Sequence, residues 1–98
     1  MKKPAAAESK TVEKELKILN KFGIHARPAA LFVKTVSQFQ CDVQVEKEGM
    51  IASAKSIMGL LTLEGHQGAV LKVTATGTDA GDAVAAIEAL IKNKFYED

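Results

Sequence analysis

The spacing of apolar residues switches between two periods along this chain, and the switches limit the folds that the chain can adopt. In two long segments, which begin near residues 26 and 79, apolar side chains recur every three or four positions, as on one face of an amphipathic helix. The segments 12–19, 41–53 and 69–76 instead alternate apolar with polar residues or are rich in β-branched residues, which is typical of strands. The chain therefore combines helices with strands.

Two shorter features complete the order of the predicted elements. Gly49 interrupts the alternation and marks a turn, so the segment around it is predicted to be a β-hairpin. Residues 56–63 open on a serine, are mostly apolar and predict a short helix. The resulting order is β-α-β-β-α-β-α. Because 98 residues provide one core, we expect a two-layer α+β fold in which both long helices cover one face of a four-stranded antiparallel sheet.

The same spacing identifies the side chains that should face the core and the residues that should cap the last helix. Asp79 or Thr78 is the predicted N-cap, because short polar side chains accept hydrogen bonds from the free N–H groups at a helix start. Asp82 suits the positive end of the helix dipole there. The inward-facing apolar residues are Val12, Leu16, Ile18, Ala29, Phe32, Val33, Val36, Cys41, Val43, Val45, Val84, Ile87, Leu90 and Ile91.

Composition and charge exclude several classes of function. Thirteen basic and twelve acidic residues leave a net charge of +1, which provides no basic face for nucleic acid. Cys41 is the single cysteine, so an intrachain disulfide and a thiolate zinc site are excluded, and the chain fits a reducing cytoplasm. No segment of the sequence approaches the ~18 consecutive apolar residues of a membrane helix. We interpret residues 1–11 as a disordered leader and residues 12–98 as the folded domain, and we expect a monomer in the cytoplasm.

A histidine and an arginine stand where the first long helix should begin. His25 precedes the helical stripe, Arg27 lies two residues further on, and Pro28 falls in the first turn, where a missing N–H costs nothing. The free N–H groups of that turn, chiefly those of Ala26 and Arg27, and the helix dipole favour an anion. An imidazole is a good nucleophile near neutral pH, and a guanidinium matches phosphate oxygens. These features predict a histidine that carries a phosphoryl group without a metal; a capping or surface histidine is the alternative.

Two separated motifs resemble one known family. The sequences GIHARPA, at residues 23–29, and KSIMGL, at residues 55–60, resemble the histidine-containing phosphocarrier proteins (HPr) of the bacterial sugar phosphotransferase system, and the element order matches the open-faced β-sandwich of that family. The resemblance implies that His25 is phosphorylated on Nδ1 and that Arg27 assists the transfer. It also implies Enzyme I, which uses phosphoenolpyruvate, as the donor and sugar-specific IIA proteins or domains as the acceptors. The chain would then be a phosphoryl carrier, without a cofactor, and not an enzyme.

Ser56 opens the predicted short helix and has two interpretations. As an N-cap it would stabilise the helix by ~1 kcal/mol. The motif SIMG that it begins also resembles the version of the HPr family in which this serine is phosphorylated by an ATP-dependent HPr kinase/phosphorylase. The same helix end favours a phosphate, which would place a second dianion near the surface that partners contact. The resemblance therefore implies regulatory phosphorylation at Ser56.

The short helix carries more apolar residues than so short a helix can bury. Ile57, Met58, Leu60 and Leu61 follow one another closely, and a helix of this length cannot point all four inward. Some of them should form an exposed apolar patch beside His25. We predict Ile57, Met58 and Leu61 as docking residues for Enzyme I and the acceptors, with Ile57 and Leu61 on the surface. Burial of the whole set in the core is the alternative.

Two positions depart from the usual pattern of the HPr family. Phe22 replaces a small polar residue before the glycine of the loop that carries His25, which removes a hydrogen-bond donor to phosphoryl oxygens. Glu64 stands where glycine is common, so a local change of the backbone is expected there. His66, in a glycine-flanked turn, is expected to be an exposed loop residue.

Two other functions stay open. An HPr-like regulatory protein of carbon or nitrogen metabolism would bind a transcription factor or an enzyme, under the control of phosphorylation at Ser56 or His25 and without sugar transport. A generic α+β domain for a small ligand would need a pocket, for which a chain of this size with one packed core leaves little room. The intact pair of His25 and Arg27 favours the phosphocarrier.

Overall fold

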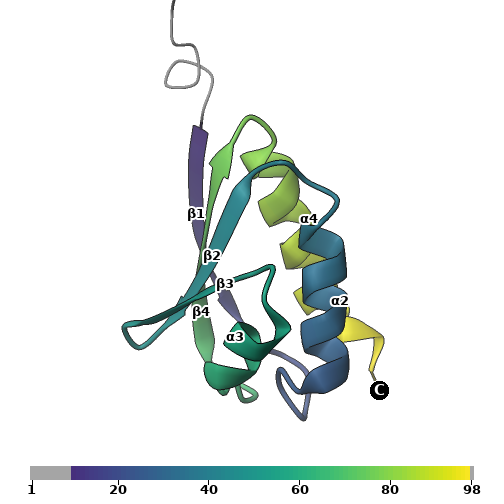
Figure 1. Ribbon diagram of the computed structural model, residues 1–98. Coiled ribbons are helices and arrows are strands. Elements are labelled where there is room, and N and C mark those ends of the chain that lie inside the picture. The colour runs from purple at the N-terminus through teal and green to yellow at the C-terminus, as the bar shows by residue number, and fades with distance from the viewer. Residues whose placement is uncertain (1–9, 98) are drawn as a thin grey trace, which may run out of the picture.

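The helices and strands follow the order that the sequence predicts. The structure is a computed structural model and describes residues 10–97. A short turn, η1, follows the last helix and was not predicted. The elements are β1 (Lys10–Lys17), α2 (Ala26–Val36), β2 (Asp42–Lys47), β3 (Met50–Ser53), α3 (Ile57–Thr62), β4 (Val70–Gly77), α4 (Ala80–Lys92) and η1 (Lys94–Tyr96) (Figure 1).

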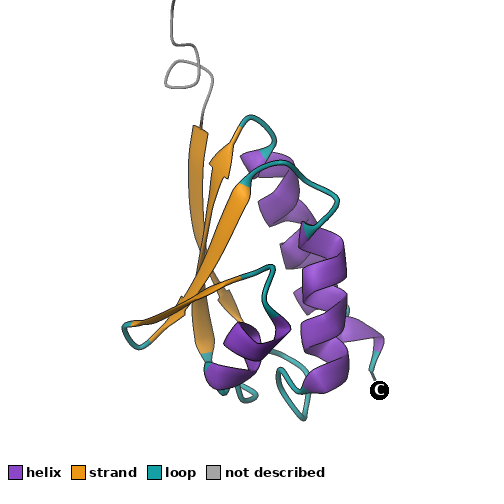
Figure 2. Cartoon of the chain, in the orientation of Figure 1, coloured by secondary structure: helices purple, strands orange, loops and turns teal. Residues whose placement is uncertain are grey.

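The four strands form one antiparallel sheet in the order β1-β4-β2-β3. All three helices lie on one side of this sheet, and the other side is open (Figure 2). The alternation of side chains explains this arrangement. In β4, Leu71, Val73 and Ala75 are buried, whereas the residues between them are half-buried or exposed. The predicted α+β open-faced sandwich is therefore confirmed.

The core lies between the sheet and the two long helices. All the side chains predicted to face it are buried, except Val12 and Val33, which are partly buried against the same cluster. Phe95 is an unpredicted member of the core: it is fully buried and stacks on Phe32, with ring centroids 6.5 Å apart and ring planes 28° apart. Because aromatic rings contribute much of the apolar area of a small core, this contact anchors η1 to α2.

Asp79 occupies the N-cap position of α4, but its side chain does not cap the helix. The carboxylate accepts hydrogen bonds from the backbone N–H groups of Gln40, at 2.8 Å, and Cys41, at 3.0 Å. These bonds, the one from Gln40 foremost, lower the pKa of the Asp79 carboxyl below its ordinary value. The predicted N-cap position of Asp79 is therefore confirmed, but its carboxylate binds the free amides that precede β2 and does not cap the helix.

The sheet begins two residues earlier than predicted. β1 starts at Lys10, which pairs with Gly77 in β4, and Thr11 pairs with Thr76. Lys10 and Thr11 therefore belong to the sheet and not to the predicted leader, whose other residues lie outside those that the structure describes. Among the described residues, no helix has the length and apolar character that crossing a membrane requires.

The backbone of η1 is unusual. Lys94, Phe95 and Tyr96 have φ angles of 54°, 54° and 59°, in the left-handed region that residues other than glycine rarely adopt. Each such residue costs roughly 1–3 kcal/mol and persists only where surrounding contacts impose it. Here the buried ring of Phe95 is one such contact. The turn directs the next residue, Glu97, back to the start of α2, where it meets His25.

Candidate functional site

His25 lies at the N-cap position of α2, and its imidazole is partly exposed. The backbone of His25 is extended, with φ −98° and ψ −166°, and its carbonyl accepts the hydrogen bond from the Ala29 N–H at 2.9 Å. The ring makes no capping hydrogen bond, and 44% of the side chain is exposed to solvent. The predicted position of His25 at the start of the first long helix is therefore confirmed.

The first turn of α2 offers two free backbone donors next to this ring. Among the described residues, no backbone carbonyl or side chain accepts a hydrogen bond from the N–H of Ala26 or of Arg27. Pro28, which follows them, has no N–H to offer, and the first turn contains no acidic residue. The unpaired N–H groups and the helix dipole therefore create a positive potential at this end of α2.

A glycine fixes the loop that carries His25. Gly23 has a φ angle of 67°, and a Cβ atom built on it would lie 2.2 Å from the carbonyl oxygen of Gly65. The N–H of Ile24 donates to that same oxygen at 2.8 Å. The loop that carries His25 therefore lies directly against the turn that precedes β4. The neighbouring His66 is exposed, as predicted, and Glu64 has a positive φ of 54°, where glycine would be favoured.

Glu97 reaches His25 from the far end of the chain. One of its carboxylate oxygens, Oε2, lies 2.7 Å from Nε2 of His25. The other oxygen, Oε1, accepts a hydrogen bond from Nδ2 of Asn20 at 2.8 Å. Asn20 is 1% exposed and also donates to the carbonyl of Gly23 at 2.8 Å. Both oxygens of one carboxylate are therefore occupied, one by the imidazole and one by a buried amide.

The ionisation of Glu97 determines which ring nitrogen of His25 carries the hydrogen. The hydrogen bond from Asn20 is the largest cause that lowers the pKa of the Glu97 carboxyl, and the hydrogen bond from His25 and the charges of His25 and Arg27 lower it further. Glu97 is therefore ionised at neutral pH and can only accept hydrogen bonds. The hydrogen between the two groups belongs to Nε2, which leaves Nδ1 of the neutral ring with its lone pair.

Arg27 is tied to the same C-terminal segment. Its Nη1 donates to the carbonyl of Phe95 at 2.8 Å and lies 3.6 Å from Oε2 of Glu97. About half of the side chain, 52%, is exposed. The guanidinium therefore partly balances the charge of Glu97 and lies within reach of the solvent beside His25.

Phe22 places an aromatic ring at the mouth of the site. It is 71% exposed, and its ring meets the imidazole of His25 edge to face, with centroids 6.4 Å apart and planes 87° apart. Nζ of Lys21 lies 5.5 Å from the centroid of the same ring. The HPr family pattern has a small polar hydrogen-bond donor at this position. In this chain an exposed aromatic ring stands there, with the ammonium group of Lys21 close to it.

Ser56 is the N-cap of α3. Its Oγ accepts a hydrogen bond from the Gly59 N–H at 2.9 Å, and the side chain is half-buried. A Cβ atom on Gly59 would lie 3.1 Å from this oxygen, so the absence of a side chain at Gly59 leaves room for the cap. The predicted capping role of Ser56 is confirmed.

The apolar residues of α3 divide between surface and core. Ile57 is 40% exposed and Met58 is 72% exposed, as an apolar patch would require. Leu60 is fully buried, and Leu61 packs partly against the core. The prediction that Leu61 lies on the surface therefore holds only in part, because part of its side chain packs against the core cluster.

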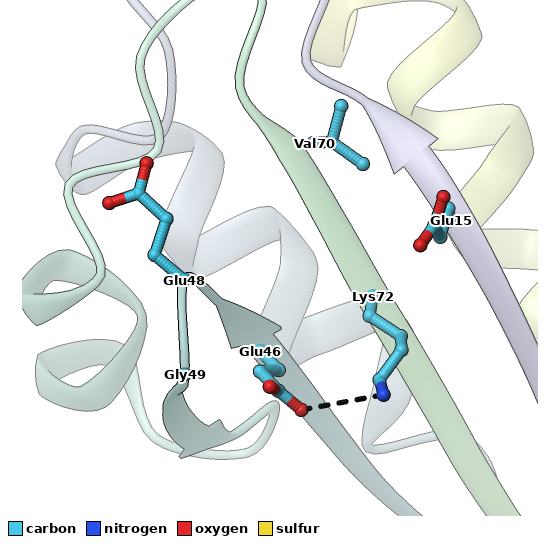
Figure 3. Close-up of a pocket in the computed structure, with 6 residues that line it drawn as sticks. All are labelled: Glu15, Glu46, Glu48, Gly49, Val70 and Lys72. Atoms are coloured by element: carbon cyan, nitrogen blue, oxygen red, sulfur yellow. Dashed lines mark ion pairs between the residues drawn. The ribbon is translucent and has the colours of Figure 1, made fainter.

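A surface hollow lies away from this site. A hollow of about 230 Å³ is formed on the helix-free face of the sheet by Glu15, Glu46, Glu48, Gly49, Val70 and Lys72 (Figure 3). Lys72 pairs there with Glu46, at 3.7 Å, and with Glu13, at 3.8 Å. None of these residues contacts His25. Among residues 10–97 no three histidine, cysteine or acidic side chains gather as metal ligands would.

Sequence reasoning missed Asn20 and Glu97. Asn20 stands in a loop that also contains Lys21 and Gly23, residue types that are common in loops. Glu97 follows the last segment with helical spacing of apolar residues. Neither position has a periodicity or a motif, and their hydrogen bond joins residues 77 positions apart. A buried asparagine and a carboxylate beside a histidine form a recognisable site only after the chain has folded.

Comparisons with known proteins find relatives in one family. Residues 12–93 match the family model described as the PTS HPr component phosphorylation site. The phosphocarrier protein HPr of Xylella fastidiosa (strain Temecula1) is 41% identical over 87 residues, which cover 89% of this chain and 98% of that protein. The solved structure of HPr-C-His from Thermoanaerobacter tengcongensis is 47% identical with a TM-score of 0.85, covering 89% of this chain and 98% of that one. An HPr dimer from the same organism is 49% identical with a TM-score of 0.72, covering 84% and 94%.

Proposed function

Since this chain belongs to the HPr family, whose members are phosphocarriers of the phosphotransferase system and not catalysts, we propose that it accepts a phosphoryl group on Nδ1 of His25 and passes it to another protein. The observation that carries the proposal is the position of the imidazole. It is partly exposed, stands at the N-cap of α2, and has Nε2 2.7 Å from the Glu97 carboxylate, so that Nδ1 is the ring nitrogen left without a partner among the described residues.

The proposed phosphoryl transfer needs no cofactor, because one bond to phosphorus forms as another breaks. The Nδ1 lone pair attacks the phosphorus of a phosphorylated donor, the bond between phosphorus and the donor breaks, and the donor keeps the electron pair. The negative charge that arrives meets the free amides of Ala26 and Arg27 and the guanidinium of Arg27. To reach the phosphoryl oxygens, the guanidinium exchanges its hydrogen bond to the Phe95 carbonyl for one to the phosphoryl group. The same steps in reverse deliver the group to an acceptor.

Enzyme I, phosphorylated from phosphoenolpyruvate, is the proposed donor, and sugar-specific IIA proteins or domains are the proposed acceptors. Both would dock on the exposed side chains of Ile57 and Met58, since α3 packs against α2 and lies beside its N-terminal half, the end at which His25 stands (Figure 1). Thioether side chains adapt to several partners, which suits Met58 to a carrier that meets proteins of different shape. Leu61 would contribute through the part of its side chain that stays exposed.

The proposed carrier works as a cytoplasmic monomer. One HPr of Thermoanaerobacter tengcongensis has been solved as a dimer, so a dimer is the alternative for this chain. Sedimentation of the full chain over a hundredfold range of concentration decides between them: a monomer keeps one mass, and a dimer dissociates on dilution or keeps twice the mass.

Ser56 is the proposed regulatory site. Its Oγ is engaged as the cap of α3 and stands beside the exposed Ile57 and Met58, so a phosphate on it would place negative charge on the docking surface. This placement favours regulation by an ATP-dependent HPr kinase/phosphorylase, and a mainly regulatory HPr-like protein as the second candidate function. ATP and that kinase should label the wild type and Ser53→Ala but not Ser56→Ala; labelling of Ser56→Ala would exclude this assignment.

Labelling from phosphoenolpyruvate tests the carrier function. Purified Enzyme I and labelled phosphoenolpyruvate should phosphorylate the wild type on a bond that is labile to acid and stable to base. His25→Ala should remain unlabelled, whereas His66→Ala, a matched loss of the other histidine, should label as the wild type does. Equal labelling of His25→Ala and the wild type would show that His25 is not the acceptor.

A further inference from the structure

We propose that Glu97, held by Asn20, is a positioning residue that keeps His25 in the tautomer whose Nδ1 is free and that balances the positive charge which the ring gains on phosphorylation. The inference rests on the proposed function, because it assigns Nδ1 as the atom that takes the phosphoryl group. It adds two residues to the site that lie 77 positions apart in the sequence, and neither lies in the motif that carries His25 and Arg27.

The hydrogen bonds of the Glu97 carboxylate leave it little freedom. Oε2 faces Nε2 of His25 at 2.7 Å, and Oε1 faces Nδ2 of Asn20 at 2.8 Å. The side chain of Glu97 is only 14% exposed, so water competes weakly for either oxygen. Because an ionised carboxylate can only accept, it holds the hydrogen on Nε2 and the imidazole in one orientation.

Asn20 fixes the carboxylate with respect to the loop. Its buried amide nitrogen donates both to Glu97 and to the carbonyl of Gly23, two residues before His25. Asn20 Oδ1 is buried and has no hydrogen-bond partner among the described residues. An unpaired buried oxygen is costly, so the two bonds made by the nitrogen are the reason for a polar side chain at this position. The amide ties the loop of His25 to the C-terminal segment.

The C-terminal segment holds Glu97 at the cost of backbone strain. Three successive residues, Lys94, Phe95 and Tyr96, have positive φ angles, which residues with a Cβ atom rarely adopt. Phe95 is locked in the core, and Arg27 binds its carbonyl. Strain of this kind concentrates where a function requires a particular position, and here the strained turn is followed directly by the carboxylate that meets the imidazole.

The charge balance gives Glu97 a role during transfer. A neutral ring that attacks phosphorus through Nδ1 keeps its hydrogen on Nε2 and becomes a cation, while the donor leaves with the electron pair of the broken bond. The carboxylate already faces the N–H that acquires this positive charge, so the stabilisation requires no rearrangement. Glu97 contacts Nε2, on the side of the ring away from Nδ1, and Nη1 of Arg27 lies 3.6 Å from Oε2 of Glu97. The negative charge of Glu97 therefore repels the incoming phosphoryl group only weakly.

Isosteric replacement separates this role from simple packing. Glutamine has the shape of glutamate but one oxygen, so Glu97→Gln cannot accept from Asn20 and His25 together. Nitrogen-15 NMR of His25 reports the tautomer directly and needs no partner protein. We expect the wild type to carry the hydrogen on Nε2, and Glu97→Gln to show a mixture of both tautomers. Its rate of phosphorylation by Enzyme I should fall by on the order of 10-fold, since partners that orient a functional histidine are commonly worth about 10- to 100-fold.

A matched control and a second variant complete the test. Glu88→Gln removes a carboxylate that pairs with Lys14 on another part of the fold, and it should change neither the tautomer nor the rate. Asn20→Ala keeps Glu97 but frees its Oε1, so it should change the tautomer in the same direction. An unchanged tautomer in Asn20→Ala would overturn the part assigned to Asn20.

The outcomes distinguish this inference from the proposed function. If the wild type is not labelled by Enzyme I at all, the carrier function fails, and the tautomer of Glu97→Gln still decides whether Glu97 positions the ring. If the wild type is labelled and Glu97→Gln matches it in tautomer and rate, the positioning role is wrong. Faster labelling of Glu97→Gln would also overturn the proposal, because Glu97 would then obstruct the site.

Discussion

Phe95 and Phe32 stack in the core with ring centroids 6.5 Å apart, and through this contact the end of the chain is fixed against the middle of α2. The same helix carries Arg27 at its start, and Nη1 of Arg27 binds the carbonyl of Phe95. The residue that fills the core and the segment that approaches His25 therefore belong to one short turn. Core packing and the geometry of the site cannot be altered independently here.

Truncation of Phe95 should lower the stability of the fold. Phe95→Ala removes a fully buried ring and should lower the free energy of unfolding by roughly 3–5 kcal/mol, measured by urea denaturation. The exposed neighbour gives the control, because Tyr96→Ala should change the free energy of unfolding by less than about 0.5 kcal/mol. A Phe95→Ala loss below about 1 kcal/mol would mean that the C-terminal turn is not anchored in the core.

Glycine at position 96 should relieve backbone strain. Tyr96 has a φ of 59°, where any residue with a Cβ atom is strained and glycine is not. Tyr96→Gly should therefore be more stable than Tyr96→Ala by about 1 kcal/mol, after allowance for the greater freedom of glycine in the unfolded chain. At an ordinary exposed position alanine is the more stable of the two. Thermal unfolding of the two variants measures the difference. If Tyr96→Ala were more stable than Tyr96→Gly, the left-handed conformation at position 96 would be contradicted.

Two glycine-to-alanine substitutions should have opposite effects. A Cβ atom on Gly23 would lie 2.2 Å from the carbonyl oxygen of Gly65, at a φ of 67°, so Gly23→Ala should displace the loop of His25, destabilise the fold by more than about 1 kcal/mol and slow phosphorylation. A Cβ atom on Gly81, in α4, meets nothing within 4 Å, so Gly81→Ala should stabilise the fold by about 0.5–1 kcal/mol. Denaturant unfolding and phosphorylation rates check both; equal effects would refute the close approach at Gly23.

Acid should remove the contribution of Glu97 to stability. Its carboxyl pKa is lowered in the folded protein, first by the hydrogen bond from Asn20, so folding favours the ionised form. The stabilisation is fully present above the ordinary carboxyl pKa of 4.5 and is lost as the pH falls through the lowered value of the folded state. The difference in unfolding free energy between wild type and Glu97→Gln should therefore shrink between neutral pH and about pH 3.

Glu88→Gln is the comparison for this pH dependence. The hydrogen bond from Lys14 is the largest cause that lowers the pKa of the Glu88 carboxyl, so its stability difference from wild type should shrink in the same direction. Phosphorylation of Glu88→Gln by Enzyme I should nevertheless equal that of the wild type. A difference for Glu97→Gln that stays constant with pH would mean that its carboxylate is not held by Asn20 and His25.

The sequence predicted those parts of the site that depend on neighbouring residues. The start of α2 at Ala26, with His25 before it and Pro28 in the first turn, follows from local spacing and from the conformational limits of proline. The cap of α3 by Ser56 is local in the same way, because Oγ and the N–H that it accepts from lie three residues apart. The order of the strands and helices followed from the change of period.

Contacts between distant parts of the chain could not be predicted. Asn20 and Glu97 were not recognised, since the hydrogen bond between them depends on how the left-handed turn after α4 is packed. Leu61 is more buried than predicted. The number of apolar residues in α3 does not determine which of them pack against the core. Asp79 stands at the N-cap of α4 as predicted, but the sequence does not show that its carboxylate accepts hydrogen bonds from the amides of Gln40 and Cys41 in another loop.

The buried ring of Phe95 is a suitable position for a spectroscopic probe of the site. Because its carbonyl is held by Arg27 and the next residue but one faces His25, any event that draws Arg27 away must alter the surroundings of an aromatic ring that solvent never touches. A fluorine atom introduced on that ring would give a single resonance, shielded from buffer and from docking proteins. Its frequency would report in real time whether the carrier is loaded or empty, even in a crowded lysate.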